Sequence, residues 1–250
     1  MKVERRSHYS GNLGREMYFN VYGHAGKPMV VFPSSGGSQD EYEAFGMIDA
    51  LSHYINEGII KVYTPQSIDQ ESWLASYKNP HDMASAHDQY DKYIIHEFVA
   101  LVRYESNWHF GLIATGCSMG AYHAVNFGLR HPDVFDVVIA QSGVYDVRFF
   151  SKDFHDEQKA YYNSPIDYLS NMSDPWFLDH YRNNEFIVSV GQGDWEGPHI
   201  YDTKRLEEIF HQKSIPGWFD YWGTDVAHDW VWWRHQIPYF MGELRRKNKL

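Results

Sequence analysis

Residues 110–122 read Phe110-Gly-Leu-Ile-Ala-Thr-Gly-Cys-Ser-Met-Gly-Ala-Tyr122, and they predict a strand, a sharp turn and the start of a helix. The turn contains the pattern Gly-x-Ser-x-Gly with Ser118 at its centre. A serine on such a turn has a strained backbone, and bulky side chains two positions before or after it would collide there. Gly116 and Gly120 remove that collision. Because an apolar strand precedes the turn and a helix follows it, the segment is typical of a nucleophile elbow.

Outward from this turn, strand-like segments recur with helical segments between them. These are Met17–Tyr22, Met29–Pro33, Ile59–Thr64, Phe110–Ala114, Val134–Gln141, Glu185–Gly191 and Trp218–Trp222. Such alternation predicts an α/β fold, with a mostly parallel sheet and helices on both faces. We expect the first two strands to pair antiparallel through the turn over 23–28. Apolar spacing predicts a packed helix over Ser85–Tyr104, and a final helix is predicted over Trp230–Leu244.

The length of 250 residues predicts one domain over 1–250. Residues 145–183 break the alternation with mixed polar and aromatic content. Loops at the carboxyl ends of parallel strands form the ligand crevice in sheets of this kind. We therefore expect 145–183 to be an insert that forms a small cap over the site.

Charge and hydropathy argue against several kinds of partner. The net charge is −11 and no large block of Lys or Arg is present, which argues against nucleic acid as a partner. The sequence predicts no membrane span and no secretory signal, so a cytoplasmic location is expected. The single Cys117 agrees with a reducing compartment.

Aromatic residues make up 17% of the chain, more than a core of this size needs. Aromatic faces stack on sugar rings and on planar acyl groups, so this richness favours carbohydrate-linked or aryl substrates. No His-Glu-x-x-His or paired-cysteine spacing is present, and no glycine-rich phosphate motif follows the early strands. We therefore expect neither a metal nor a cofactor.

A serine hydroxyl needs an imidazole to take its proton, and that imidazole needs a carboxylate to orient it. In the Ser-acid-His order of such folds, both partners follow later strands. His228 lies just after the last predicted strand and before the final helix, which is where the base is expected. His131, His211 and His235 are expected to be surface or capping residues.

Two carboxylates compete for the role of the acid. Asp194 lies directly after the strand Glu185–Gly191, and Glu196 lies two residues farther along the same loop. Position favours Asp194, with Glu196 as the alternative. Asp225 and Asp229 flank His228, where Asp229 is expected to cap the final helix.

The oxyanion of an ester reaction needs two backbone N–H donors. One is expected from Met119, the residue after the nucleophile, and the second from the loop after an early strand. Residues 30–38 fit that loop, and either Ser35 or Gly36 would supply the second N–H group.

Four segments together resemble the esterase family of α/β-hydrolases that includes feruloyl and acetyl-xylan esterases, S-formylglutathione hydrolase and mycolyltransferases. They are Phe32-Pro-Ser-Ser-Gly-Gly37, Gly116-Cys-Ser-Met-Gly120, Gly191-Gln-Gly-Asp194 and Ala227-His-Asp-Trp230. The resemblance runs from about residue 10 to about residue 242. This chain has Pro33-Ser34 where many members have a His-Gly pair.

The resemblance implies an α/β-hydrolase fold with Ser118 as nucleophile, His228 as base and Asp194 or Glu196 as acid. It also implies oxyanion donors at Met119 and in the Ser35-Gly36 stretch. The expected activity is hydrolysis of short-acyl, aryl or carbohydrate-linked esters through an acyl-enzyme. The alternatives are an acyltransferase that uses the same residues, or a binding protein on this scaffold without catalysis.

Overall fold

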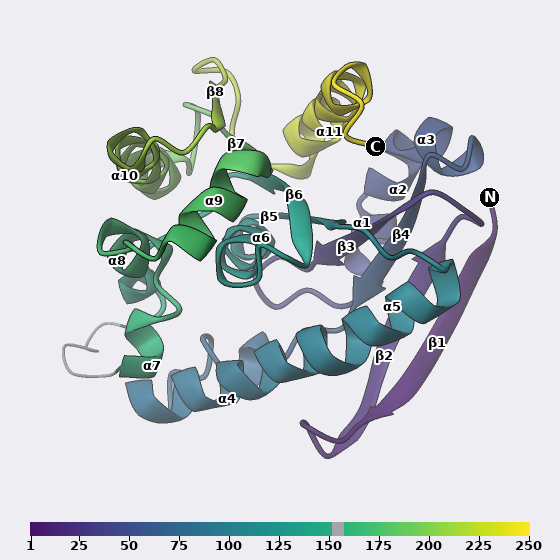
Figure 1. Cartoon of the computed structure of the whole chain (residues 1–250), viewed down its shortest axis with the longest axis horizontal. Coiled ribbons are helices and arrows are strands. Elements are labelled where there is room, and N and C mark those ends of the chain that lie inside the picture. Colours follow the sequence, from purple (N-terminus) through teal and green to yellow (C-terminus); the bar gives the residue numbers. More distant parts are fainter. Residues whose placement is uncertain (152–157) are drawn as a thin grey trace.

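A sheet of eight strands forms the centre of the computed structural model, which describes residues 1–151 and 158–250 (Figure 1). The strands are β1 (Val3–Ser10), β2 (Arg15–Tyr22), β3 (Lys27–Phe32), β4 (Ile60–Pro65), β5 (Leu112–Cys117), β6 (Phe135–Gln141), β7 (Glu185–Val190) and β8 (Trp218–Tyr221). They lie in the order β1-β2-β4-β3-β5-β6-β7-β8. β2 is antiparallel to both of its neighbours, and the other pairs are parallel. The predicted α/β-hydrolase fold, with its mostly parallel sheet, is confirmed.

The amino-terminal edge of the sheet differs from the prediction. β2 and β3 do not pair, because β3 lies between β4 and β5 and is parallel to both. All six residues of β3 are buried, as expected for a strand covered on both faces, so it occupies the middle of the sheet. The antiparallel partners of β2 are β4 and the unpredicted β1, which forms a hairpin with it.

Helices cover both faces of the sheet. One face carries α4 (Pro80–Lys92), α5 (Val99–Ser106), α6 (Met119–Arg130), α8 (Pro165–Ser170) and α10 (Gly197–Lys213). The other carries α1 (Glu41–Ala44), α2 (Met47–Ala50), α3 (Ser52–Asn56) and α11 (Trp230–Arg246). Strand side chains alternate between the two layers, so that Val30 and Phe32 join the first cluster and Met29 and Val31 the second. Figure 1 shows α4 and α5 on one side of the sheet and α11 on the other.

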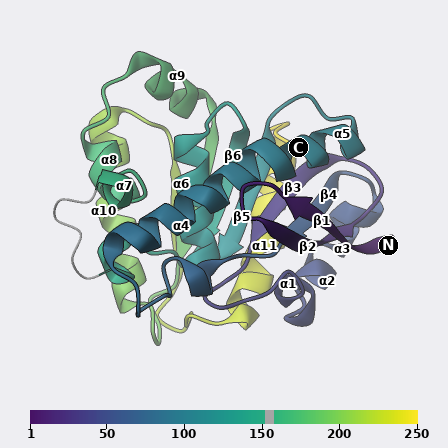
Figure 2. The same cartoon turned by 90° about the horizontal axis from the view of Figure 1, so that it is seen from below.

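The helix predicted over Ser85–Tyr104 is present within a longer one. α4 continues through the π-helical segment η2 (Tyr93–Phe98) into α5, and Figure 2 shows this helix crossing the molecule. It begins after Asn79, whose side chain accepts a hydrogen bond from the Asp82 N–H group, and proline occupies its first position. No helix among the described residues is both long and apolar enough to cross a bilayer.

The segment 145–183 lies between β6 and β7, as expected of an insert. Its described elements are η3 (Val147–Phe149), α7 (Gln158–Tyr161), α8 and α9 (Pro175–Asn183). The part of the predicted cap over 152–157 lies outside the described residues. A short 3-10 helix, η1 (Asp69–Glu71), follows β4.

Candidate active site

Ser118 occupies the single position between the end of β5 and the start of α6. Its φ of 56° and ψ of −120° are the strained conformation expected of an elbow. A Cβ atom on Gly120 would lie 2.2 Å from the Phe32 carbonyl oxygen, and one on Gly116 would lie 2.5 Å from the carbonyl carbon of Gly120. Both glycines are therefore needed for the close approach of strand, turn and helix.

His228 lies against Ser118, in the loop between β8 and α11. Its Nε2 atom is 3.0 Å from Ser118 Oγ, a distance at which the hydroxyl can donate its proton to the ring. Its Nδ1 atom is 3.2 Å from Glu196 Oε2. The three side chains form a continuous hydrogen-bonded chain, although they come from positions 118, 196 and 228.

Glu196 is the carboxylate that faces His228, which corrects the preference for Asp194. Asp194 is exposed. Its contact with His228 uses the backbone: the Asp194 carbonyl oxygen accepts a hydrogen bond from the His228 backbone N–H group at 3.0 Å. The intervening Trp195 has a φ of 68°, in the left-handed region that a bulky residue seldom adopts. This local reversal leaves Trp195 exposed and turns the next side chain, Glu196, into the fully buried position beside the ring.

Further hydrogen bonds hold the Glu196 carboxylate in place. Its Oε1 atom accepts from Ser142 Oγ at 2.6 Å and from the Gly191 N–H group at 3.3 Å. Ser142 Oγ in turn accepts from the Trp233 indole N–H at 3.0 Å. Ser142 follows β6, Gly191 follows β7 and Trp233 belongs to α11, so the carboxylate is fixed from three elements. Neither Ser142 nor Trp233 was predicted from the sequence as a partner of the site. For Ser142, its position as a polar residue at the end of a buried strand could have indicated this role.

His199, which was not predicted from the sequence either, stacks on His228. The ring centroids are 4.1 Å apart and the planes differ by 20°. Burial, and after it the neighbouring His228, lowers the pKa of His199 to about 4. His199 is therefore neutral at neutral pH. Its only signal in the sequence was its place three residues after Glu196, at the start of α10.

Glu196, His199 and His228 each offer a ligand atom within 4.8 Å of the others, a spacing that a metal ion could bridge. The local geometry does not fit one, however. Both ring nitrogens of His228 already face Ser118 and Glu196. The lone pairs of imidazole lie in the ring plane, so those of two stacked rings do not converge on one point.

A cavity of about 270 Å³ opens beside Ser118. Its other lining residues are mostly apolar and come from the loops after β3, β4 and β6 and from α6 and α10: Ser35, Trp73, Leu74, Ser76, Met119, Val144, Phe149, Phe150 and His199. The structure thus brings two of the predicted oxyanion residues, Ser35 and Met119, to the wall that contains Ser118. Met119 is the first residue of α6, a position whose N–H group has no partner within the helix.

The loop after β3 is held by Glu41. The Ser34 backbone N–H and side-chain hydroxyl both donate to the Glu41 carboxylate, each at 2.7 Å. Burial raises the pKa of Glu41, and these hydrogen bonds oppose that shift. Gly36, the third predicted oxyanion residue, adopts a φ of 73° in this loop and is not among the residues that line the cavity.

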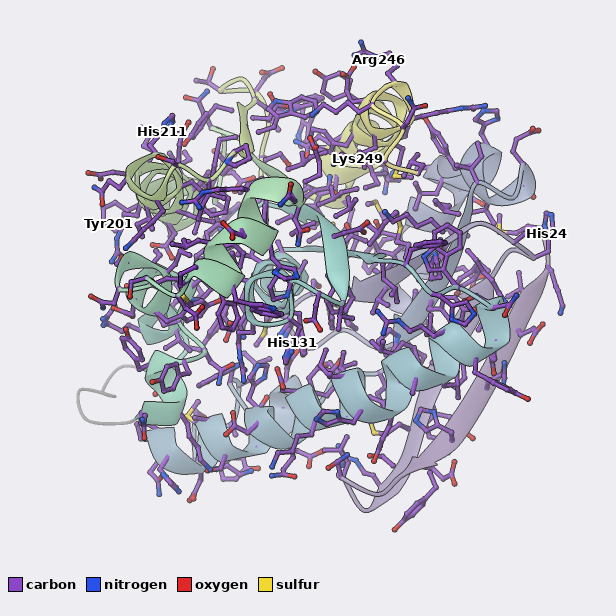
Figure 3. All side chains as sticks on the ribbon, in the orientation of Figure 1. His24, His131, Tyr201, His211, Arg246 and Lys249 are labelled. Carbon is purple, nitrogen blue, oxygen red and sulfur yellow. The ribbon has the colours of Figure 1, made fainter. Side chains whose placement is uncertain are left out.

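Figure 3 labels two of the other candidate histidines, His131 and His211. His131 follows α6, and its Nε2 atom is 2.9 Å from Asp91 of α4. His211 is on α10 with 80% of its side chain exposed, and His235 is exposed on α11. Asp229 caps α11, as predicted, by accepting a hydrogen bond from the Val231 N–H group.

A second hollow, of about 540 Å³, lies among α4, α6 and the insert. Tyr162 and Phe177 of the insert line it together with Arg130 of α6. Arg130 is already paired with Asp91. Of the described residues of the insert, Phe149 and Phe150 line the cavity beside Ser118.

Comparisons with known proteins agree with this fold. The family model described as "Putative esterase" matches residues 10–244. Among solved structures, a ferulic acid esterase is 18% identical, with 95% of each chain covered and a TM-score of 0.74. An S-formylglutathione hydrolase from Agrobacterium tumefaciens is 16% identical over 96% of this chain and 93% of that one, with a TM-score of 0.72. The MPT51 protein of Mycobacterium tuberculosis is 14% identical over 98% of each chain, with a TM-score of 0.75. No curated protein matches this chain.

Proposed function

This chain belongs to the "Putative esterase" family, and we propose that it hydrolyses carboxylic esters through an acyl-enzyme on Ser118. The observation that carries the proposal is the hydrogen-bonded chain from Ser118 Oγ through both ring nitrogens of His228 to Glu196. A serine, a base within hydrogen-bond reach and a group that orients the base are the parts that nucleophilic catalysis needs.

In the first half of the reaction, His228 takes the hydroxyl proton as Ser118 attacks the ester carbonyl carbon. The buried Glu196 carboxylate stabilises the imidazolium that forms. Backbone N–H groups of Met119 and of the Ser35-Gly36 stretch stabilise the oxyanion, where loss of one donor typically costs about 3 kcal/mol. His228 then gives its proton to the leaving alcohol. Water attacks the acyl-enzyme in the second half, again with His228 as base.

The cavity supports a proposal for the substrate class. A volume of about 270 Å³ is at the small end of ligand pockets, which favours a short acyl group or one aromatic ring. The walls carry Trp73, Phe149 and Phe150, whose faces can pack on a planar or sugar ring. We therefore propose small-molecule esters with short-acyl, aryl or carbohydrate-linked groups as substrates. A cytoplasmic location remains a prediction from the sequence.

The test compares the wild type with Ser118→Ala on p-nitrophenyl acetate, butyrate and octanoate and on methyl ferulate. We expect wild-type turnover on the shorter esters or on methyl ferulate, and a loss of at least about 10³-fold in kcat in the variant. The thermal unfolding midpoint of both proteins controls for folding. Turnover that Ser118→Ala leaves unchanged would rule out the proposed nucleophile.

A further inference from the structure

His199 contacts both parts of the candidate site, the cavity and the base. Only 8% of the residue is exposed, and its ring lines the cavity that contains Ser118. Its ring also covers one face of His228 at 4.1 Å. The acyl transfer described above uses no group of His199, although a polar imidazole is costly to bury.

The geometry explains why the His228 ring needs a neighbour on its face. Its two hydrogen bonds, to Ser118 and Glu196, lie at its two nitrogens. They fix the positions of these atoms but leave the ring free to rock about the line that joins them. The face-to-face contact with His199 and the edge contact of Trp233, at 4.9 Å and 89°, oppose that rocking.

The stacking contact between His199 and His228 also affects the positive charge that His228 acquires. His228 becomes positively charged each time it holds the proton of Ser118. A neutral aromatic ring over its face attracts that charge, as in a cation–π contact, whereas a charged ring would repel it. Burial and the proximity of His228 keep the pKa of His199 low, at about 4, so it remains neutral while His228 is charged.

We propose that His199 is a positioning residue that fixes the ring plane of His228 and covers it with a neutral aromatic face during proton transfer. This inference rests on the proposed function. It adds a requirement to the three hydrogen-bonded side chains. They hold the ring nitrogens of His228, whereas His199 holds the face of that ring.

The test uses His199→Phe, which keeps an aromatic face, and His199→Leu, which fills similar space without one. We expect His199→Phe to keep kcat for p-nitrophenyl acetate within about 3-fold of the wild type, and His199→Leu to lose about 10- to 100-fold, with little change in KM. His211→Leu is the matched control, because it makes the same substitution at an exposed histidine on the same helix.

Each other result contradicts the inference in a distinct way. A His199→Leu variant that keeps the kcat of the wild type, as His199→Phe is expected to do, would show that no aromatic face is needed. A His199→Phe variant as slow as His199→Leu, at an unchanged unfolding midpoint, would show that a ring nitrogen is the required group. An effect on KM alone would make His199 a wall of the cavity only. Wild-type turnover independent of Ser118 would overturn the proposed function, whereas Ser118-dependent turnover with unaffected His199 variants would overturn this inference alone.

Discussion

Glu196 and Asp194 are two positions apart, yet their side chains occupy opposite environments. Glu196 is fully buried against His228, whereas Asp194 is exposed. The difference arises at Trp195, whose left-handed backbone could not be expected from its residue type, because glycine is the usual residue there. The contact between Ser118 and His228 could be predicted from their local patterns, but which carboxylate faces His228 depended on one backbone angle.

The two carboxylates form a matched pair for mutation. Glu196→Gln should lower kcat by about 10³-fold, since a neutral amide cannot stabilise the imidazolium and can favour the wrong tautomer of His228. Asp194→Asn removes a charge from the same loop and should leave kcat within about 3-fold of the wild type, because its hydrogen bond to His228 uses the backbone. The kcat of each variant for p-nitrophenyl acetate shows which of the two carboxylates the reaction needs. A larger loss in Asp194→Asn would contradict the structural assignment.

His199 also makes a prediction about stability and pH. Its pKa is about 4 in the folded protein, whereas an unperturbed histidine has a pKa of 6.5, so between these values the unfolded chain binds a proton that the folded protein does not. Falling pH in this window therefore favours unfolding. Relative to the wild type, His199→Phe should gain about 2 kcal/mol in free energy of unfolding between pH 7 and pH 4.5. Urea titrations of both proteins at pH 7 and pH 4.5 measure this gain. If the free energies of unfolding of variant and wild type differ by the same amount at both pH values, the lowered pKa of His199 is contradicted.

At the scale of elements, the elbow was predictable because its pattern is local. Strand β5, the turn and helix α6 are consecutive, and their small residues indicate the close contact. β1 was missed because its sequence, Val-Glu-Arg-Arg-Ser-His-Tyr-Ser, has few apolar residues and lies at the sheet edge. The position of β3 beside β4 and β5 was missed because pairing between strands distant in sequence leaves no mark in either one.

Two glycines test the elbow as an element. Gly120→Ala should lower the free energy of unfolding by at least about 2 kcal/mol, because its Cβ would overlap the Phe32 carbonyl oxygen and the backbone must move. Gly242→Ala is the control within helix α11, where the nearest atom is at 3.6 Å; there alanine should stabilise the helix by up to about 1 kcal/mol. Urea unfolding compares the two, and equal effects would show that the elbow tolerates a methyl group.

At the scale of the whole molecule, Lys27 connects distant parts of the chain. Its side chain is 6% exposed, and its ammonium group lies 3.0 Å from Asp136 Oδ2 at the second residue of β6 and donates to the Lys249 carbonyl oxygen at 2.9 Å. Lys27 begins β3, so this contact ties the centre of the sheet to the end of the chain. A lysine before an apolar strand is no indication of such a partner.

This contact predicts an asymmetry between its two partners. Asp136→Asn should cost about 2 kcal/mol in free energy of unfolding, because it leaves a buried ammonium without its countercharge. Lys27→Met should cost less, since Asp136 is 40% exposed and water can solvate it. Denaturant titrations at neutral pH measure both values, and a greater cost for Lys27→Met would contradict this explanation.

Ser142 and Gly191 donate hydrogen bonds to Glu196, and Trp233 donates one to Ser142, so ester hydrolysis would report on whether α11 has docked on the sheet. The elbow around Ser118 is built from β3, β5 and the end of β6, since Gly120 packs against the Phe32 carbonyl and the Ser118 N–H group donates to Gln141. Glu196, in contrast, is held by groups in the last half of the chain, and one of them belongs to α11. We expect turnover to return during refolding only when this docking is complete, even where secondary structure returns earlier. The delay between the two signals would measure how long the carboxyl-terminal helix takes to complete the catalyst.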